Sequence, residues 1–530
     1  MIIQNLEQYS YLIDAILNPA LSHQYFLGDK DTDIVKFIFY TFPIFILQGP
    51  PGTGKTWTAK ELIKLSLKKD HFKRILISSK EHAALDDLLN KTFRMCQDLD
   101  INPKPILVRL ISTEREREYT PKSIAFKHFP KQIAIKMLND ISSWKPENEK
   151  YNKLINYISE VIEEENVAPS REWVDIIRES ANLVFCTSMA VDLRELELSS
   201  PNFDLVIVEE AGKTYPSELF RPLQLGNKWV LIGDQNQLPP FRLNDIEAII
   251  NEELDLTEEA NQDNLDFNES EFLEFRKLVL NELKIFQSLF ERFKGISPSY
   301  NSADKRKSCD TLMDQYRLPS KISKMISNVF YDEEFNQQIS DSNDFLVEPY
   351  QFKEEQLIWI NTKQDKRFNE QRKGTDIYNL GEARLILDLL KSIKISSKYK
   401  NFKVAILTPY KEQMEILQAN LPNILKNLPG IYIKESCYTI DSFQGQEAEL
   451  VIISLVRSNR KETAQTAWGF VRNPERLNVM LSRAKKIEII VGNFDMCMIH
   501  KRNQSMDKFV KVAEFIQEEG KIINFDELIF

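Results

Sequence analysis

The stretch Gly49-Pro50-Pro51-Gly52-Thr53-Gly54-Lys55-Thr56 decides the fold class of this chain. It follows an apolar run, residues 44–47, and precedes a segment, residues 57–69, with the composition of a helix. A G-x-x-x-x-G-K-[ST] loop between a strand and a helix turns its backbone N–H groups toward an anion, and the helix directs its positive end to the same point. The pattern therefore predicts a binding loop for the phosphates of a nucleoside triphosphate.

The residues of this loop have separate expected roles. Lys55 is predicted to reach the β- and γ-phosphates, and the hydroxyl of Thr56 is predicted to ligate magnesium. A Gly/Pro-rich turn before a helix is the alternative, but three of the chain's 15 glycines fall within six positions here. The other positions predicted to contact the nucleotide are Gly49, Gly52, Thr53 and Gly54.

Length and cysteine usage limit the class of protein. At 530 residues the chain exceeds one hydrophobic core, so about two to four domains are expected. The five cysteines are far apart and form no C-x-x-C pair or Cys/His cluster, which argues against disulfides, a zinc module and an iron–sulfur cluster. This usage favours a reducing, cytoplasmic location.

Membrane association is not expected from the sequence. The first residues lack the basic region and long apolar core of a signal peptide. The most apolar segment, residues 37–47, is too short to span a bilayer and is interrupted by Pro43. It is better explained as the buried strand that leads into the phosphate loop.

The net charge of −10 is concentrated in one segment. Residues 245–274 contain 12 acidic and no basic side chains, so the rest of the chain is near neutral to slightly basic. Because the local field along a groove decides nucleic-acid binding, the total charge does not exclude it. We interpret the acidic segment as a solvated or partly disordered insertion, with a role in partner binding or self-shielding as the alternative.

Hydrophobic patterning predicts an α/β fold with two series of strands alternating with helices, and hence parallel sheets. A first domain is expected over residues 1–242, with a charged helical insertion at about 113–182. An acidic insertion and inter-domain connection is expected over 243–300, and a second domain over 301–530. The predicted strands are 45–48, 74–78, 106–110, 183–186, 205–208, 229–232, 356–360, 404–408, 435–439, 450–455 and 487–491.

Polar residues follow two of these strands at the positions that nucleotide hydrolysis requires. Glu209 and Glu210 end the strand at 205–208, which is the Walker B position of a phosphate-loop protein. Glu209 is predicted to hold magnesium, through a water, and Glu210 to orient and deprotonate the attacking water. Two exposed glutamates in a turn are the alternative. Gln237, after the strand at 229–232, is predicted to sense the γ-phosphate.

The motifs resemble, in order, those of superfamily 1 helicases of the group that includes the nonsense-mediated-decay helicase and its DNA-processing relatives. The resemblance extends over residues 46–484, and the order of the motifs is more specific than any one of them. Besides the phosphate loop, the matching segments are 77–88, 184–188, 209–212, 233–240, 314–331, 406–410, 441–447 and 476–484.

The resemblance implies two RecA-like domains that clamp ATP and Mg²⁺ between them. Arg317 and Arg483, both from the second domain, are implied to reach the γ-phosphate, where a planar guanidinium spreads charge over the phosphoryl oxygens. Tyr316 is implied to stack on the nucleobase, and Glu447 to contact the ribose or a water beside the phosphates.

The resemblance also implies a single-stranded DNA or RNA partner and movement from 5′ to 3′. Hydroxyls and backbone amides hold phosphates without reading sequence, which suits a motor. A motor of this length is expected to work with a separate effector chain such as a nuclease. The candidate strand contacts are Ser79, Thr187, Thr408 and Tyr410.

One departure from the family pattern keeps a second hypothesis open. The family's motif usually begins with aspartate, whereas this chain has Glu209. The extra methylene moves the carboxylate by roughly 1.5 Å. A nucleotide-gated nucleic-acid-binding or scaffold subunit with weak turnover is therefore the alternative function.

Overall fold

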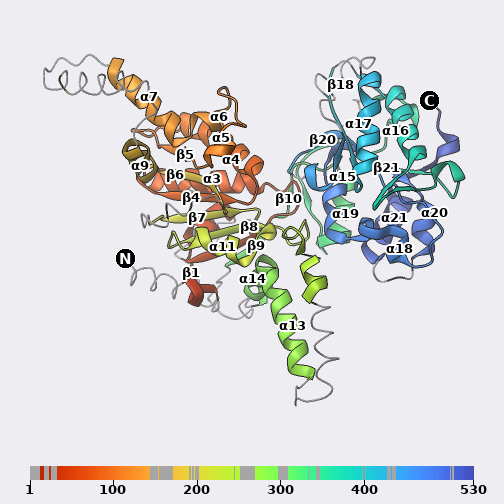
Figure 1. The fold of residues 1–530 in the computed structure, drawn as a ribbon, viewed down its shortest axis with the longest axis horizontal. Coiled ribbons are helices and arrows are strands. Elements are labelled where there is room, and N and C mark those ends of the chain that lie inside the picture. The colour runs from red at the N-terminus through yellow and green to blue at the C-terminus, as the bar shows by residue number, and fades with distance from the viewer. Residues whose placement is uncertain are drawn as a thin grey trace. The chain divides into compact units, whose positions relative to one another are not determined.

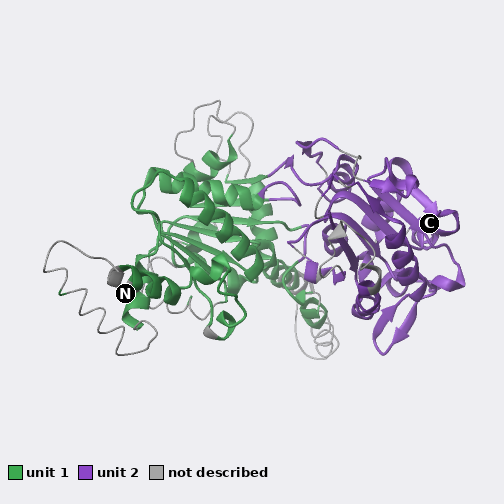
Figure 2. Cartoon of the chain, turned by 90° about the horizontal axis from the view of Figure 1, so that it is seen from above, with its two compact units in different colours: residues 1–48, 55–235, 239–311 green, residues 49–54, 236–238, 312–530 purple. Residues whose placement is uncertain are grey.

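A computed structural model describes most of the chain. The described residues are 12–16, 23–24, 33–143, 153, 171–189, 193, 196, 202–243, 245–250, 269–295, 308–331, 333–341, 346–396, 398–399, 402–425, 431–432, 437–443, 445–501, 503 and 506–529. The chain divides into two compact units (Figure 2). The first comprises residues 1–48, 55–235 and 239–311, and the second comprises 49–54, 236–238 and 312–530.

The first unit is built on a seven-stranded parallel sheet in the order β5-β6-β4-β7-β8-β3-β9 (Figure 1). The strand that feeds the phosphate loop, β3, lies between β8 and β9, and β7 lies beside β8. The strands are β3 (Ile44–Gln48), β4 (Ile75–Ser79), β5 (Leu107–Arg109), β6 (Leu183–Thr187), β7 (Leu205–Glu209), β8 (Trp229–Gly233) and β9 (Cys309–Thr311).

These segments form strands because both faces of the sheet are covered. Every residue of β3, β4, β6, β7 and β8 is buried, as expected for parallel strands that read as continuous apolar runs. The helices of this unit are α2 (Ile34–Tyr40), α3 (Lys55–Lys69), α4 (His82–Asp98), α5 (Thr113–Glu116), α6 (Ile124–Lys127), α7 (Pro130–Ser143), α9 (Arg171–Ser180), α11 (Pro216–Leu223), α13 (Glu269–Leu283) and α14 (Ile285–Gly295).

The second unit has its own parallel sheet, in the order β18-β17-β20-β21-β13-β22, and β19 also pairs with β17. The central strand β20 is flanked by β17 and β21, so the chain segments that follow β17 and β20 emerge at the same edge. The strands are β13 (Leu357–Asn361), β17 (Phe402–Thr408), β18 (Ile431–Tyr432), β19 (Cys437–Thr439), β20 (Ala448–Ser454), β21 (Ala484–Gly492) and β22 (Lys521–Asn524).

Two hydrophobic clusters fill the second unit, and each contains residues from the central strands. The helices are α15 (Ser320–Ile326), α16 (Leu380–Ser392), α17 (Lys411–Leu425), α18 (Ala464–Trp468), α19 (Pro474–Leu481), α20 (Phe494–Ile499) and α21 (Asp507–Glu519). Short two-stranded sheets pair β1 (His23–Gln24) with β2 (Thr41–Phe42), β10 (Asp314–Gln315) with β11 (Asn336–Gln337), β12 (Leu346–Glu348) with β16 (Lys394–Ile395), and β14 (Gln371–Lys373) with β15 (Asp376–Tyr378).

The predicted α/β fold class with parallel sheets is confirmed, and both units are RecA-like. The eleven predicted strands all have a counterpart, displaced by at most a few residues. β9 and β22 were not expected, and β9 extends the first sheet beyond residue 300. Helices α5, α6, α7 and α9 lie within the predicted helical insertion, whereas most of 144–170 and residues 251–268 of the acidic segment lie outside the described residues.

Candidate nucleotide and nucleic-acid sites

The phosphate loop is a compact turn between β3 and α3. Gly52 and Gly54 have φ angles of +78° and +95°, in the left-handed region that favours glycine. The side chain of Thr53 is buried, and its hydroxyl donates a 2.8 Å hydrogen bond to the carbonyl of Pro50. The loop is therefore shaped by its own backbone, with Lys55 as the first residue of α3.

The predicted acidic pair lies close to this helix. Glu209 ends β7 and is 3% exposed, and it accepts a hydrogen bond from the side chain of Thr56. Burial, together with the neighbouring charge of Glu210, raises the pKa of Glu209 to about 7, while Thr56 and the charge of Lys55 act in the opposite direction. The structure thus brings together Lys55, Thr56, Glu209 and Glu210, which the sequence analysis had grouped only by motif.

One carboxylate oxygen of this cluster could bind a cation, or a water molecule coordinated by a cation. Oε1 of Glu209 is buried and has no hydrogen-bond partner within the described residues. A buried carboxylate oxygen without a partner is costly, and a hard cation or its bound water would satisfy it. Glu210 has a φ of 55°, so the chain turns sharply after β7. A left-handed non-glycine residue at the end of a strand is a form of strain that is often found at functional sites.

The turns after β7 and β8 pack closely against each other. A Cβ on Gly212 would lie 2.9 Å from the carbonyl oxygen of Asp234, and one on Gly233 would lie 2.7 Å from the backbone nitrogen of Gly212. Both positions therefore require glycine. Gln237, the predicted γ-phosphate sensor, is 5% exposed in the segment that follows β8.

Gln315 holds the phosphate loop within the second unit and was missed by sequence reasoning. Its side chain is fully buried, and its amide nitrogen donates a 2.7 Å hydrogen bond to the carbonyl of Pro51. Its Oε1 accepts bonds from the backbone nitrogens of Arg317 and Leu318, at 2.8 and 3.1 Å. The only available signal was the position of Gln315 between residues already singled out, because its partner lies 264 residues away.

Tyr316 and Arg317 follow Gln315 but meet different surroundings. The Tyr316 backbone donates a 3.0 Å hydrogen bond to the carbonyl of Gly52, and its side chain is 57% exposed. Nε of Arg317 forms a 2.7 Å ion pair with Oε2 of Glu447. Burial would raise the pKa of Glu447, but Arg317 and Lys485 hold it below its ordinary value. The predicted roles of these three residues toward a nucleotide stay predictions.

Arg483 contacts the helix that precedes it, α19. It is 3% exposed in the turn between α19 and β21, and its Nε donates a 2.8 Å hydrogen bond to the carbonyl of Val479. Arg317 and Arg483, predicted to serve one phosphate, are therefore each engaged elsewhere. Their reach toward a nucleotide stays a prediction.

The predicted strand contacts all lie at the carboxyl ends of strands and are all buried. Ser79 is paired in register with Thr187 on one side and Glu209 on the other. Thr408 ends β17 with no exposed surface, and Tyr410 follows it at 4% exposure. Ligands of parallel α/β sheets bind at this edge. Contact with a strand through these side chains is untested and stays a prediction.

Comparison with known proteins identifies the family. Two family models, each described as an AAA domain, match residues 27–245 and 285–495. An uncharacterised ATP-dependent helicase of Methanocaldococcus jannaschii is 24% identical, with 93% of this chain and 71% of the relative covered. The chain belongs to the superfamily 1 helicases. The predicted resemblance to the nonsense-mediated-decay helicase-like group is thereby confirmed, as the next relatives show.

Two further relatives of this superfamily 1 helicase are from yeasts. The DNA polymerase alpha-associated DNA helicase A of Saccharomyces cerevisiae is 26% identical, covering 91% of this chain and 66% of its own. The ATP-dependent helicase upf1 of Schizosaccharomyces pombe is 27% identical, covering 85% of this chain and 43% of its own. The chain therefore spans about two fifths to seven tenths of the length of these relatives.

Among the described helices, none has both the length and the apolar composition that a bilayer crossing needs.

Proposed function

We propose that the chain is an ATP-dependent translocase and helicase that moves along single-stranded nucleic acid. The observation that carries this proposal is the grouping of Lys55, Thr56, Glu209 and Glu210 beside the phosphate loop. Phosphoryl transfer to water needs a loop that binds the phosphates, a carboxylate oxygen that can bind the metal ion or its water, and a second carboxylate that orients the attacking water. Family membership supports the coupling to nucleic acid.

In the proposed reaction, Lys55 binds the β- and γ-phosphates and Glu210 accepts the proton of the attacking water. Gln237 senses the γ-phosphate, and Arg317 and Arg483 move from their present partners to stabilise the charge on the oxygens of the γ-phosphoryl group. Tyr316, with its half-exposed ring, stacks on the base, while Glu447 contacts the ribose side. The loop residues Gly49, Gly52, Thr53 and Gly54 bind the phosphates.

Thr56 and Glu209 would hold Mg²⁺ with the nucleotide. The buried Oε1 of Glu209, without a partner among the described residues, supports this assignment. When bound, the ion neutralises charge on the phosphate oxygens. Binding of the ion would also favour the ionised form of Glu209, whose pKa is raised in its absence.

Single-stranded DNA or RNA is the proposed track, with movement from 5′ to 3′. Ser79, Thr187, Thr408 and Tyr410 mark the strand path, and the carboxyl-edge location of all four supports this assignment. A separate nuclease or other effector chain is the proposed partner. The cytoplasmic location stays a prediction; the five cysteines are all buried and none forms a disulfide.

The proposal is tested by ATP hydrolysis with and without single strands. Hydrolysis by the wild type should rise many-fold with single strands, and Lys55→Ala or Glu210→Gln should lower it by roughly 100- to 1,000-fold. Lys64→Ala removes a lysine from the same helix that forms an ion pair with Glu61 at 3.0 Å, and it should leave the rate unchanged. Full hydrolysis by Lys55→Ala would show that the phosphate-loop assignment is wrong.

The nature and polarity of the track need two further measurements. Stimulation by DNA and RNA of matched sequence, compared at several salt concentrations, identifies the preferred polymer, because affinity for phosphates falls steeply with salt. Displacement of streptavidin from the 3′ end but not from the 5′ end of a biotinylated strand is the result expected for 5′-to-3′ movement.

A nucleotide-gated binding or scaffold subunit with weak turnover is the second candidate. It is favoured by Glu209, whose side chain is one methylene longer than the aspartate usual at this position and whose pKa is raised by burial. Under this alternative the wild type turns over slowly even with single strands, and Glu209→Asp gains strong turnover. Fast strand-stimulated hydrolysis by the wild type would exclude the alternative.

A further inference from the structure

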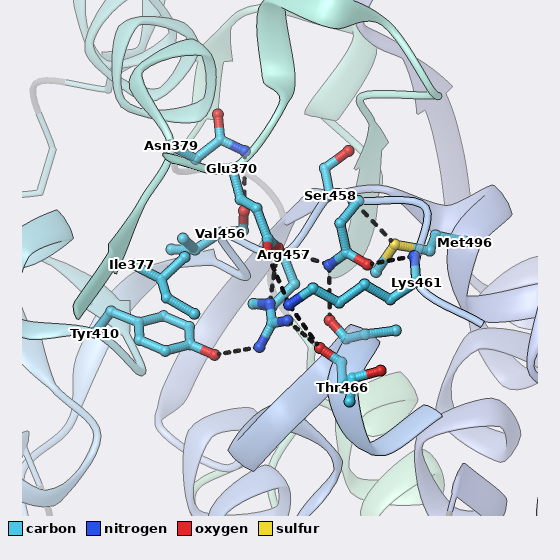
Figure 3. Close-up of polar contacts among 12 residues, drawn as sticks. Glu370, Ile377, Asn379, Tyr410, Val456, Arg457, Ser458, Lys461, Thr466 and Met496 are labelled. Carbon is cyan, nitrogen blue, oxygen red and sulfur yellow. Dashed lines mark hydrogen bonds and ion pairs between the residues drawn. The ribbon is translucent and has the colours of Figure 1, made fainter. Parts of the chain in front are cut away.

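A buried arginine organises the edge of the second sheet, just after β20. Arg457 is 3% exposed, and Figure 3 shows its guanidinium between three partners. Nε pairs with Glu370 at 2.8 Å, Nη1 donates to the hydroxyl of Tyr410 at 3.0 Å, and Nη2 donates to the carbonyl of Thr466 at 2.6 Å. The segments around Glu370, Tyr410 and Arg457, which are distant in the sequence, are thereby held at one point.

The backbone immediately before Arg457 is strained. Val456 has a φ of 70°, where a β-branched residue is a true outlier. Its nitrogen donates to Glu382 at 2.8 Å. Its carbonyl accepts from Asn379 at 3.0 Å (Figure 3). Such strain persists only where the surroundings over-determine it. The strained turn directs Arg457 toward Tyr410.

Tyr410 does not itself present a surface to solvent. It is 4% exposed, and its ring centroid lies 5.5 Å from that of Phe470 at an interplanar angle of 37°. Phe470, in contrast, is 51% exposed, although Tyr410 contacts it and the guanidinium of Arg476 lies 5.3 Å from its centroid. The network thus ends in a half-exposed aromatic ring.

The turn that carries Phe470 is fixed in place by this network. Gly469 has a φ of +55°, and a Cβ there would lie 2.7 Å from Nη1 of Arg457 and 3.4 Å from the hydroxyl of Tyr410. The carbonyl of Phe470 accepts a 3.1 Å hydrogen bond from Asn473, the N-cap of α19. The ring therefore projects from a supported turn rather than from a loose loop.

The surroundings of Phe470 are basic and lie at a ligand-binding edge. Between 457 and 476 the chain has five basic and two acidic side chains, although its overall charge is −10. Tyr410 and Arg457 follow the carboxyl ends of the adjacent parallel strands β17 and β20. An exposed aromatic beside cations is the combination with which proteins bind single strands, through base stacking and phosphate contact.

We propose that Phe470 is a stacking platform for a base of single-stranded nucleic acid, with Arg476 beside it for the adjoining phosphate. Tyr410 and Arg457 are positioning residues beneath the platform, so Tyr410 contributes to the proposed strand path by supporting Phe470. This inference rests on the proposed function and specifies the side chain that it uses.

Strand affinity, measured by fluorescence anisotropy without nucleotide, tests the platform. Phe470→Ala should weaken binding to oligo-dT or oligo-U by roughly 5- to 150-fold, the fold-change for loss of one base stack. Phe470→Trp should restore it. Tyr350→Ala is the matched control, since Tyr350 is an aromatic of the same unit that is 79% exposed; its affinity should be unchanged.

Two further readouts separate stacking from loss of structure. A 2-aminopurine base in the strand should be quenched by the wild type and by Phe470→Trp, but not by Phe470→Ala. A strand with abasic sites should bind the wild type and Phe470→Ala equally. Tyr410→Phe removes the hydroxyl that Arg457 holds and leaves a buried donor unpaired, so it should lower the melting temperature and also reduce the quenching at temperatures where the variant is still folded.

Two different results distinguish an error in the assignment of the platform from an error in the proposed function. If the wild type binds strands and Phe470→Ala binds them equally well, with the same quenching, the platform is wrong and Phe470 belongs to a protein-binding surface. If the wild type neither binds strands nor responds to them in ATP hydrolysis, the proposed function itself is wrong, and the platform with it.

Discussion

At the scale of single residues, Gly52 combines a left-handed backbone with a lack of space for any side chain. Its φ is +78°, and a Cβ there would lie 2.2 Å from Oε1 of Gln315 and 2.7 Å from Cβ of Arg317. Because Gln315 uses that oxygen to bind two backbone nitrogens, it cannot move away without breaking them. The geometry of the phosphate loop therefore depends on the absence of one side chain.

We expect Gly52→Ala to abolish nucleotide binding, whether measured with a fluorescent ATP analogue or as hydrolysis. Gly374→Ala separates the effect of φ from that of space, since Gly374 has a φ of +62° but no atom within 4 Å of the added Cβ. It should cost about 1 kcal/mol of stability and leave nucleotide binding intact. Equal nucleotide binding by both variants would contradict a role for the contact with Gln315.

At the scale of elements, the start of α16 is tied to two other segments by one side chain, that of Asn379. Asn379 is the N-cap: its oxygen accepts from the backbone nitrogen of Glu382 at 3.0 Å. Its amide nitrogen donates to the carbonyls of Phe368 and Val456, at 2.6 and 3.0 Å. Asn379 is fully buried, so these groups have no access to water if the side chain is removed.

Asn379→Ala should therefore destabilise the protein by roughly 2–5 kcal/mol, which combines the loss of a cap with unsatisfied buried carbonyls. Thr463→Ala is the comparison, because Thr463 caps α18 at an exposed position and bonds the nitrogen of Thr466 at 3.3 Å. Its cost should be about 1 kcal/mol. Urea unfolding of the two variants measures the difference, and equal costs would show that the buried bonds of Asn379 contribute little.

At the scale of the whole molecule, buried carboxyl groups link stability to pH. Burial raises the pKa of Glu382 to about 8, although Ser454 and the backbone of Val456 oppose the shift. Burial also raises the pKa of Glu488 well above its ordinary value, and neither oxygen of Glu488 has a partner among the described residues. In the folded state both groups hold a proton at pH values where the unfolded chain has released it.

The free energy of unfolding should therefore fall as pH rises from about 4.5, the ordinary value, to about 8, by a few kcal/mol for Glu382 alone. Glu382→Gln cannot ionise, so its stability relative to the wild type should improve across this range. Glu519→Gln is the control, because the hydrogen bond from Lys324 lowers the pKa of Glu519. Urea unfolding at several pH values tests this; a constant difference between Glu382→Gln and wild type would contradict it.

Much of the fold could be predicted because its strands are short apolar runs closed by turn residues. β7, for example, is Leu-Val-Ile-Val followed by Glu209, and the structure contains the strand that this pattern predicts. β9 and β22 escaped prediction because they are short or partly polar, and only pairing with β3 and β13 makes them strands. Gln315 escaped because its partner is 264 residues away. The exposure of Tyr410 and Phe470 could not be predicted, because packing at the sheet edge decides it.

The phosphate loop and the acidic pair after β7 could be recognised from the sequence because each is a short run of neighbouring residues, and the helicase family because its motifs follow in order along residues 46–484. The three-dimensional fold was needed to show which groups meet: the Gln315 side chain with the carbonyl of Pro51, Arg317 with Glu447, and Arg457 with Tyr410. It also decided that Tyr410 is covered while Phe470 is open. Such contacts join distant segments, and the free energy that selects them comes from packing of the complete core rather than from any local propensity.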